Sequence, residues 1–201
     1  MGKIPGERTH INVAAIHEAG HALACLREGR QVFSVSVDRD APGAGLCTHA
    51  KRPPNPFNIA LGPGSARAAW EHTWATTSAD IRISLAGPLA EAYALRKPLR
   101  HIGAISDLEN CLYMAERLID LGRYMEQQVP IAVVEPKKLL EAQKTNVRRW
   151  IHRTKNWEAI KLIASVLAYN GELDAKVLDY LVSINRPGAD HKLVLKFLET
   201  I

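Results

Sequence analysis

Cysteine is scarce in this sequence, and its spacing argues against two common structural roles. The three cysteines, Cys25, Cys47 and Cys111, are odd in number and far apart, and no C-x-x-C pair occurs. This pattern argues against a disulfide framework and against a cysteine zinc knuckle. It fits reduced thiols, and we therefore expect a cytoplasmic protein.

Long hydrophobic runs are also missing. No stretch reaches the roughly 18 unbroken apolar residues of a membrane span, and residues 1–10 lack the apolar segment of a secretory signal. The P-loop pattern G-x-x-x-x-G-K-[ST] occurs nowhere, so no nucleotide partner is expected. With 201 residues, 23 % of them charged, the chain is predicted to form a single globular domain over residues 1–201.

The positive charge is concentrated in one segment. Residues 137–161 hold eight lysines and arginines against two glutamates, a local charge of +6 in a chain whose net charge is +5. Such a segment can bind nucleic acid or an acidic partner. The solvated face of an amphipathic helix is the preferred interpretation, so nucleic acid is not expected as a partner.

The most informative stretch is His17-Glu18-Ala19-Gly20-His21, an H-E-x-x-H pattern inside an apolar run. Asn12 or Thr9 can cap a helix over residues 9–28, which Gly29 would end. On a helix both imidazoles leave the same face and can share one Zn²⁺, with Glu18 beside them as a general base for an attacking water. The alternative is a pair of histidines packed in a helix interface.

The rest of the chain predicts a mostly helical α+β domain. Residues 31–38 read as a half-buried strand in which Phe33, Val35 and Val37 alternate with small polar residues, and residues 46–50 can return beside it. An exposed edge strand here would bind an extended peptide through its main chain. Residues 51–64 are rich in proline and glycine and predict a mobile loop.

Helices are predicted over most of the remaining residues. The starting signals are a cap at Ser78 or Thr77, a Ser106–Glu109 capping box, Pro136 in a first turn, and Asp174. The predicted ranges are 65–75, 78–96, 106 onward, 136–169 with a break near Thr154 or Asn156, 174–184, and a last helix from Asp190.

A catalytic zinc site usually has three protein ligands, and the third is not in the motif. The longer pattern H-E-x-x-H-x-x-G-x-x-H is absent, because position 27 is arginine. The third ligand must therefore come from a distant segment, and residue chemistry leaves five candidates: Asp107, Glu91, His49, His72 and His101. Glu91 can also orient a histidine from behind.

Several blocks of this sequence resemble the protease domain of the FtsH-type ATP-dependent zinc proteases. The similar blocks are the motif run from Ala15 to Leu23, the strand from Val32 to Val37, residues 83–91, which are similar to the family's "LAGRAAE" helix, and residues 103–108, similar to its "GAxxDL". The resemblance implies a zincin-like helix, a Zn²⁺ ion held by His17, His21 and Asp107, and Glu18 as the general base. Related domains form rings, which implies a possible homo-oligomer.

Two departures from that family shape the functional hypothesis. The family joins this domain to an ATPase module and membrane helices, neither of which occurs here, and residues 51–64 and 70–74 do not match its pattern. We therefore expect a stand-alone, ATP-independent zinc metalloendopeptidase that cleaves unfolded or flexible polypeptides, with the substrate added to the strand near residues 32–37. The alternatives are a binding or regulatory module that keeps the metal as a structural clamp, and a metallohydrolase acting on another amide.

Overall fold

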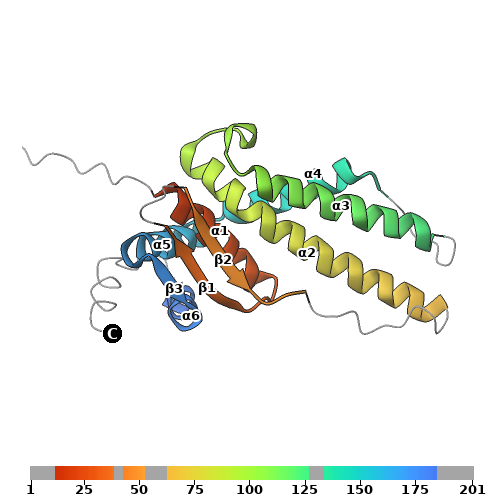
Figure 1. The fold of residues 1–201 in the computed structure, drawn as a ribbon, viewed down its shortest axis with the longest axis horizontal. Coiled ribbons are helices and arrows are strands. Elements are labelled where there is room, and N and C mark those ends of the chain that lie inside the picture. Colours follow the sequence, from red (N-terminus) through yellow and green to blue (C-terminus); the bar gives the residue numbers. More distant parts are fainter. Residues whose placement is uncertain (1–11, 39–42, 53–62, 127–133, 185–201) are drawn as a thin grey trace, which may run out of the picture.

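The computed structural model describes residues 12–38, 43–52, 63–126 and 134–184. These residues form a mostly helical α+β fold with one small antiparallel sheet, as predicted (Figure 1). Most of the expected loop at 51–64 and the helix expected from Asp190 lie outside the described residues. In chain order the elements are α1 (Val13–Arg27), β1 (Val32–Val37), β2 (Gly45–His49), α2 (Pro63–Leu95), a short 3-10 helix (Leu99–His101), α3 (Ile105–Met125), α4 (Pro136–Ile151), α5 (Thr154–Asn170), β3 (Glu172–Asp174) and α6 (Ala175–Ile184).

Helix α1 carries the H-E-x-x-H motif and lies at the centre of the fold. Its first turn is capped by Asn12, whose Oδ1 accepts a hydrogen bond from the Ala15 backbone N–H at 3.0 Å. Gly29 follows its end with φ at +71°, a conformation that glycine adopts without strain. The helix packs against α2, α5 and both strands β1 and β2. Its buried alanines allow this close approach on several sides: Ala14, Ala15, Ala19, Ala22 and Ala24.

The sheet corrects two expectations about residues 32–37. The strand order is β2-β1-β3, with both pairs antiparallel, so β1 is the central strand and cannot accept an added peptide at either edge. A bulge between Val32 and Ser34 also resets the alternation of side chains. Val32 is therefore buried with Val35, whereas Phe33 is 49 % exposed rather than internal.

Residues 63–95 form one helix, not the two that were predicted. Thr77 and Ser78 were expected to cap a new helix, but both are buried in the middle of α2. Serine and threonine are tolerated inside helices, where their hydroxyls can bond to a preceding carbonyl, as Thr76 does to His72 at 2.9 Å. Packing of α2 on α1, α3 and α4 thus outweighs the local capping signal.

The later helices follow some local signals and not others. Helix α3 starts with Ala104 as its N-cap and no side-chain cap, so the Ser106–Glu109 capping box was wrong and Asp107 is the third helical residue rather than the first. Pro136 does open α4, and the predicted break lies between α4 and α5. No helix within the described ranges has the length and apolar character needed to cross a membrane.

The close contact between α1 and α2 depends on two glycines. A Cβ added at Gly20 would lie 2.7 Å from the Ala86 carbonyl oxygen and 2.9 Å from the Ala90 Cβ. A Cβ added at Gly87 would overlap the imidazoles of His17 and His21. The close approach of α1 to α2 at Gly87 therefore occurs at the motif itself.

We predict that Gly20→Ala lowers the free energy of unfolding by about 1–3 kcal/mol, because the new methyl group has no space between α1 and α2. Helix propensity alone predicts the opposite, a stabilisation of about 1 kcal/mol. Urea denaturation distinguishes the two. Gly103→Ala is the control, since a Cβ there meets no atom within 4 Å, and its effect should stay within about 0.5 kcal/mol. A Gly20→Ala protein as stable as the unmodified one would contradict the close contact.

Candidate metal centre

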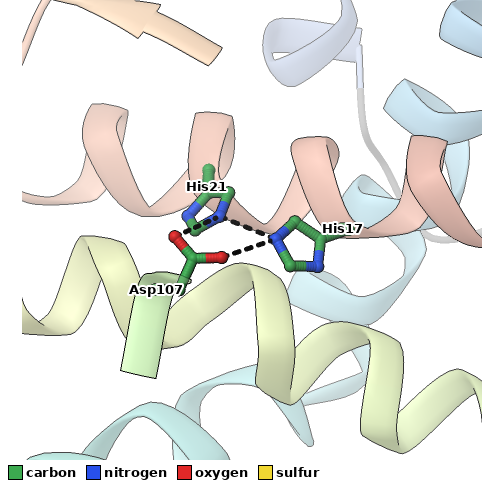
Figure 2. A group of neighbouring side chains, drawn as sticks. All are labelled: His17, His21 and Asp107. Atoms are coloured by element: carbon green, nitrogen blue, oxygen red, sulfur yellow. Dashed lines mark hydrogen bonds and ion pairs between the residues drawn. The ribbon is translucent and has the colours of Figure 1, made fainter. Parts of the chain in front are cut away.

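Three side chains from two distant helices converge at one point (Figure 2). His17 and His21 leave the same face of α1, and Asp107 reaches them from the first turn of α3. The His17 Nε2 lies 3.0 Å from the His21 Nε2 and 3.1 Å from the Asp107 Oδ2, and the His21 Nε2 lies 3.6 Å from the Asp107 Oδ1. The three residues offer ligand atoms within 4.8 Å of one another.

The outer ring nitrogens determine which atoms face the centre of this cluster. The His21 Nδ1 lies 2.8 Å from the Ile83 carbonyl oxygen, and the His17 Nδ1 lies 2.9 Å from the Glu91 Oε2. Both partners are acceptors, so each Nδ1 carries the proton and donates it, and in the neutral rings each Nε2 presents a lone pair. Two lone pairs and a carboxylate then face one another, an arrangement that a cation satisfies. His17, His21 and Asp107 thus form a group that could hold a metal ion.

The structure separates the five candidates for the third ligand. Asp107 joins the two histidines, and Glu91 lies behind His17 and orients its ring. His49 lines the same cavity but bonds to the Ala50 carbonyl instead, with its Nδ1 3.0 Å from that oxygen. His72 and His101 do not line that cavity.

Charge and burial shift the pKa values of the cluster in opposite directions. Burial lowers the pKa of His17, but hydrogen bonds to Asp107 and Glu91 outweigh it, and the pKa is raised above 6.5. Burial raises the pKa of Asp107, but the adjacent imidazoles of His17 and His21 outweigh that effect and hold the pKa well below its usual range. Asp107 is therefore ionised and ready to ligate at any physiological pH.

Glu18 lines the same cavity, which has a volume of about 590 Å³. Its side chain is on the buried face of α1, and the residue is 7 % exposed. None of the described residues hydrogen-bonds to its carboxylate. Burial raises its pKa, and the nearby His21 and His17 oppose that shift only in part. A carboxylate that faces a cavity from a buried residue and has a raised pKa is typical of a catalytic acid or base.

Sequence reasoning missed the contacts made by β2 at this cavity. Gly45 lies against Glu18, since a Cβ at Gly45 would be 2.8 Å from the Glu18 Oε1. Cys47 and His49 line the cavity, and both lower the pKa of the free thiol of Cys25. Hydrogen bonding to Cys47 lowers the pKa of Cys25 to about 6. No local sequence pattern signals these contacts, because they depend on how β2 packs on α1.

No protein-family model and no curated protein matches this chain. Activity at this site is therefore inferred from its geometry and from the sequence blocks that resemble FtsH-type protease domains.

We predict that metal affinity falls in a defined order among three variants, when Zn²⁺ is used as the probe ion in competition with a chelating dye. Asp107→Ala removes a ligand and should weaken binding most. Glu91→Gln leaves the ligands but removes the carboxylate that orients His17, and it should cost about 10–100-fold in affinity. The control, Glu109→Gln, makes the same charge change at an exposed position of α3 and should bind normally. Equal affinities for Glu91→Gln and Glu109→Gln would contradict the orienting role.

We also predict that metal binding weakens as the pH falls. Protons compete with the metal for the Nε2 of His17, and the raised pKa of this residue favours the proton. The affinity should therefore begin to fall above pH 6.5, the ordinary value for histidine, rather than below it. The same dye competition, repeated from about pH 8.5 to 5.5, measures this dependence. An affinity that stayed constant down to about pH 6 would contradict the prediction.

Proposed function

We propose that this protein is a zinc-dependent, ATP-independent endopeptidase that acts in the cytoplasm on unfolded or flexible polypeptides. The observation that carries the proposal is the position of Glu18, a buried carboxylate without a hydrogen-bond partner among the described residues, in the cavity that also contains His17, His21 and Asp107. The resemblance of residues 15–23, 83–91 and 103–108 to FtsH-type protease domains supports the same reading.

The donor set favours zinc over other common divalent ions. Two imidazole nitrogens and one carboxylate suit Zn²⁺, whereas Mg²⁺ and Ca²⁺ prefer oxygen ligands. Tetrahedral zinc with bonds of about 2.0–2.1 Å holds its donor atoms about 3.3 Å apart. The His17 Nε2 lies at similar distances here, 3.0 Å from the His21 Nε2 and 3.1 Å from the Asp107 Oδ2. The carboxylate of Glu91 behind His17 is also typical of zinc sites.

Each residue of the chain has a distinct role in this proposal. His17, His21 and Asp107 hold the ion, and Glu91 and the Ile83 carbonyl keep the imidazoles in the ligating tautomer. When bound, a zinc ion would polarise the carbonyl of the substrate peptide bond and lower the pKa of its bound water to about 7. Glu18 takes the proton of the attacking water on its carboxylate and returns it to the leaving amine. The raised pKa of Glu18 makes it a stronger base for this transfer.

The edge of β2 is the proposed docking line for the substrate. Within the described residues β2 pairs with β1 on one side only, and Gly45, Leu46 and Cys47 line the cavity. Leu46 is 63 % exposed, which leaves it accessible to a substrate side chain. A peptide added to β2 would bind through its main chain, whatever its sequence, provided that it is extended. This requirement selects unfolded or flexible segments.

We predict that Glu18→Gln lowers peptide turnover by about 10²–10⁴-fold, because the amide cannot accept the proton of water. The zinc content should not change, since Glu18 is not a ligand. Cleavage of labelled unfolded casein, measured alongside metal analysis, tests both points, with Glu109→Gln as the charge-matched control. Equal turnover by Glu18→Gln would remove the proposed base. A zinc-loaded protein that cleaves no polypeptide would favour the metal clamp of a binding module.

A further inference from the structure

A second cavity lies on α2 away from the metal centre and has a volume of about 630 Å³. It is formed where the end of α2 meets the consecutive helices α4 and α5, which lie far from it in the sequence. Buried side chains of Leu89 and Ala92 are part of its apolar lining. It shares no lining residue with the cavity around Glu18. A volume of this size suits a ligand about as large as a mononucleotide.

The charges around this second cavity have one sign. Arg96, Lys97, Arg148 and Lys161 line it, and no carboxylate among the described residues does. Lys161 pairs with Glu158 at 2.8 Å, but the other three make no ion pair within the described ranges. Some exposed cations elsewhere on the helices are paired, as Arg67 is with Glu71 at 3.1 Å. Three uncompensated cations that converge on one concave surface repel one another, and an anion with two charges relieves that repulsion.

One wall of the second cavity is aromatic. The rings of Tyr93 and His152 are stacked, with centroids 4.4 Å apart and an interplanar angle of 30°. Trp157 meets Tyr93 edge to face at 4.7 Å. Contacts of this kind hold all three rings in place, and Tyr93 is nevertheless 40 % exposed. The wall offers a planar, apolar surface beside the cations.

The rim of the second cavity includes the turn that ends α2, in which Arg96 has a left-handed conformation. Arg96 has φ at +52°, and among the described residues it is the only non-glycine residue with a positive φ. Such a conformation costs on the order of 1 kcal/mol for a residue with a side chain, and glycine would avoid the cost. The Lys97 N–H donates to the Ala92 carbonyl at 3.0 Å and closes this turn. The turn places two cations in succession at the cavity.

We propose that this second cavity binds a small aromatic phosphate of mononucleotide size, with the phosphate among Arg96, Lys97 and Arg148 and the planar ring against the Tyr93–His152–Trp157 wall. The guanidinium groups match phosphate oxygens in geometry as well as charge. The missing P-loop pattern concerns a different device, a backbone loop, and does not bear on a site built from side chains. The proposal is independent of peptidase activity at the metal centre.

Titration of the purified protein with adenosine monophosphate by calorimetry tests this site. We expect one ligand per chain, with inorganic phosphate and adenosine each binding at least about tenfold more weakly, since each lacks one half of the match. Arg148→Ala should weaken binding by about tenfold or more. Arg149→Ala is the matched control: it is the next residue of α4, it is equally exposed, and it lines a different hollow. Its effect should be less than about twofold.

Four results would overturn the proposal. One is the absence of binding at about 10 mM adenosine monophosphate, beyond the weak end of specific affinities. The second is an affinity for inorganic phosphate equal to that for adenosine monophosphate, which would mean a simple anion patch. The third is an affinity for adenosine equal to that for adenosine monophosphate, which would mean that the phosphate is not recognised. The fourth is an equal loss of affinity for adenosine monophosphate in Arg148→Ala and Arg149→Ala, which would mean that the whole basic face of α4 binds polyanions. Binding of a single-stranded oligonucleotide to both variants tests the same point. Circular dichroism melting of both variants verifies that each is folded.

Discussion

The close packing of α1 against α2 is the constraint on which the candidate site depends. Gly20 and Gly87 leave no room for a side chain between the two helices. Because the helices approach so closely, the Ile83 carbonyl and the Glu91 carboxylate of α2 reach the outer nitrogens of His21 and His17. Those two hydrogen bonds turn both Nε2 lone pairs toward Asp107. The two glycines, which have no side chain, thus allow the contacts that set the tautomer and direction of two potential metal ligands.

The surroundings of Glu18 depend on a different contact, that of β2 with α1. Its carboxylate is buried beside Gly45 and lacks a hydrogen-bond donor among the described residues. Desolvation therefore raises its pKa, while Asp107, surrounded by two imidazoles, has its pKa lowered. The surroundings of these two carboxylates shift their pKa values in opposite directions, which supports the proposal that Glu18 transfers protons and Asp107 binds the metal.

Local sequence signals were right where the hydrogen bonds that they describe stay within a few residues. Asn12 caps α1, and Asp174 Oδ1 accepts from the Val177 N–H at 2.8 Å at the start of α6. They were wrong where packing competes. A cap is worth about 1 kcal/mol, and the contacts of α2 with three other helices outweigh that, so Ser78 lies inside the helix. Phe33 was misplaced because a bulge cannot be read from alternation.

The amino-acid order alone determined that His17 and His21 share one face of a helix with Glu18 beside them, because helical periodicity links residues four apart regardless of context. It also determined a mostly helical domain with a small sheet. It did not determine the third ligand: residue chemistry left five candidates, and only a family resemblance singled out Asp107. The position of that carboxylate, 90 residues along the chain and 3.1 Å from the His17 Nε2, was decided by the tertiary structure, because it depends on how α1, α2 and α3 pack together rather than on any bond between neighbours in sequence.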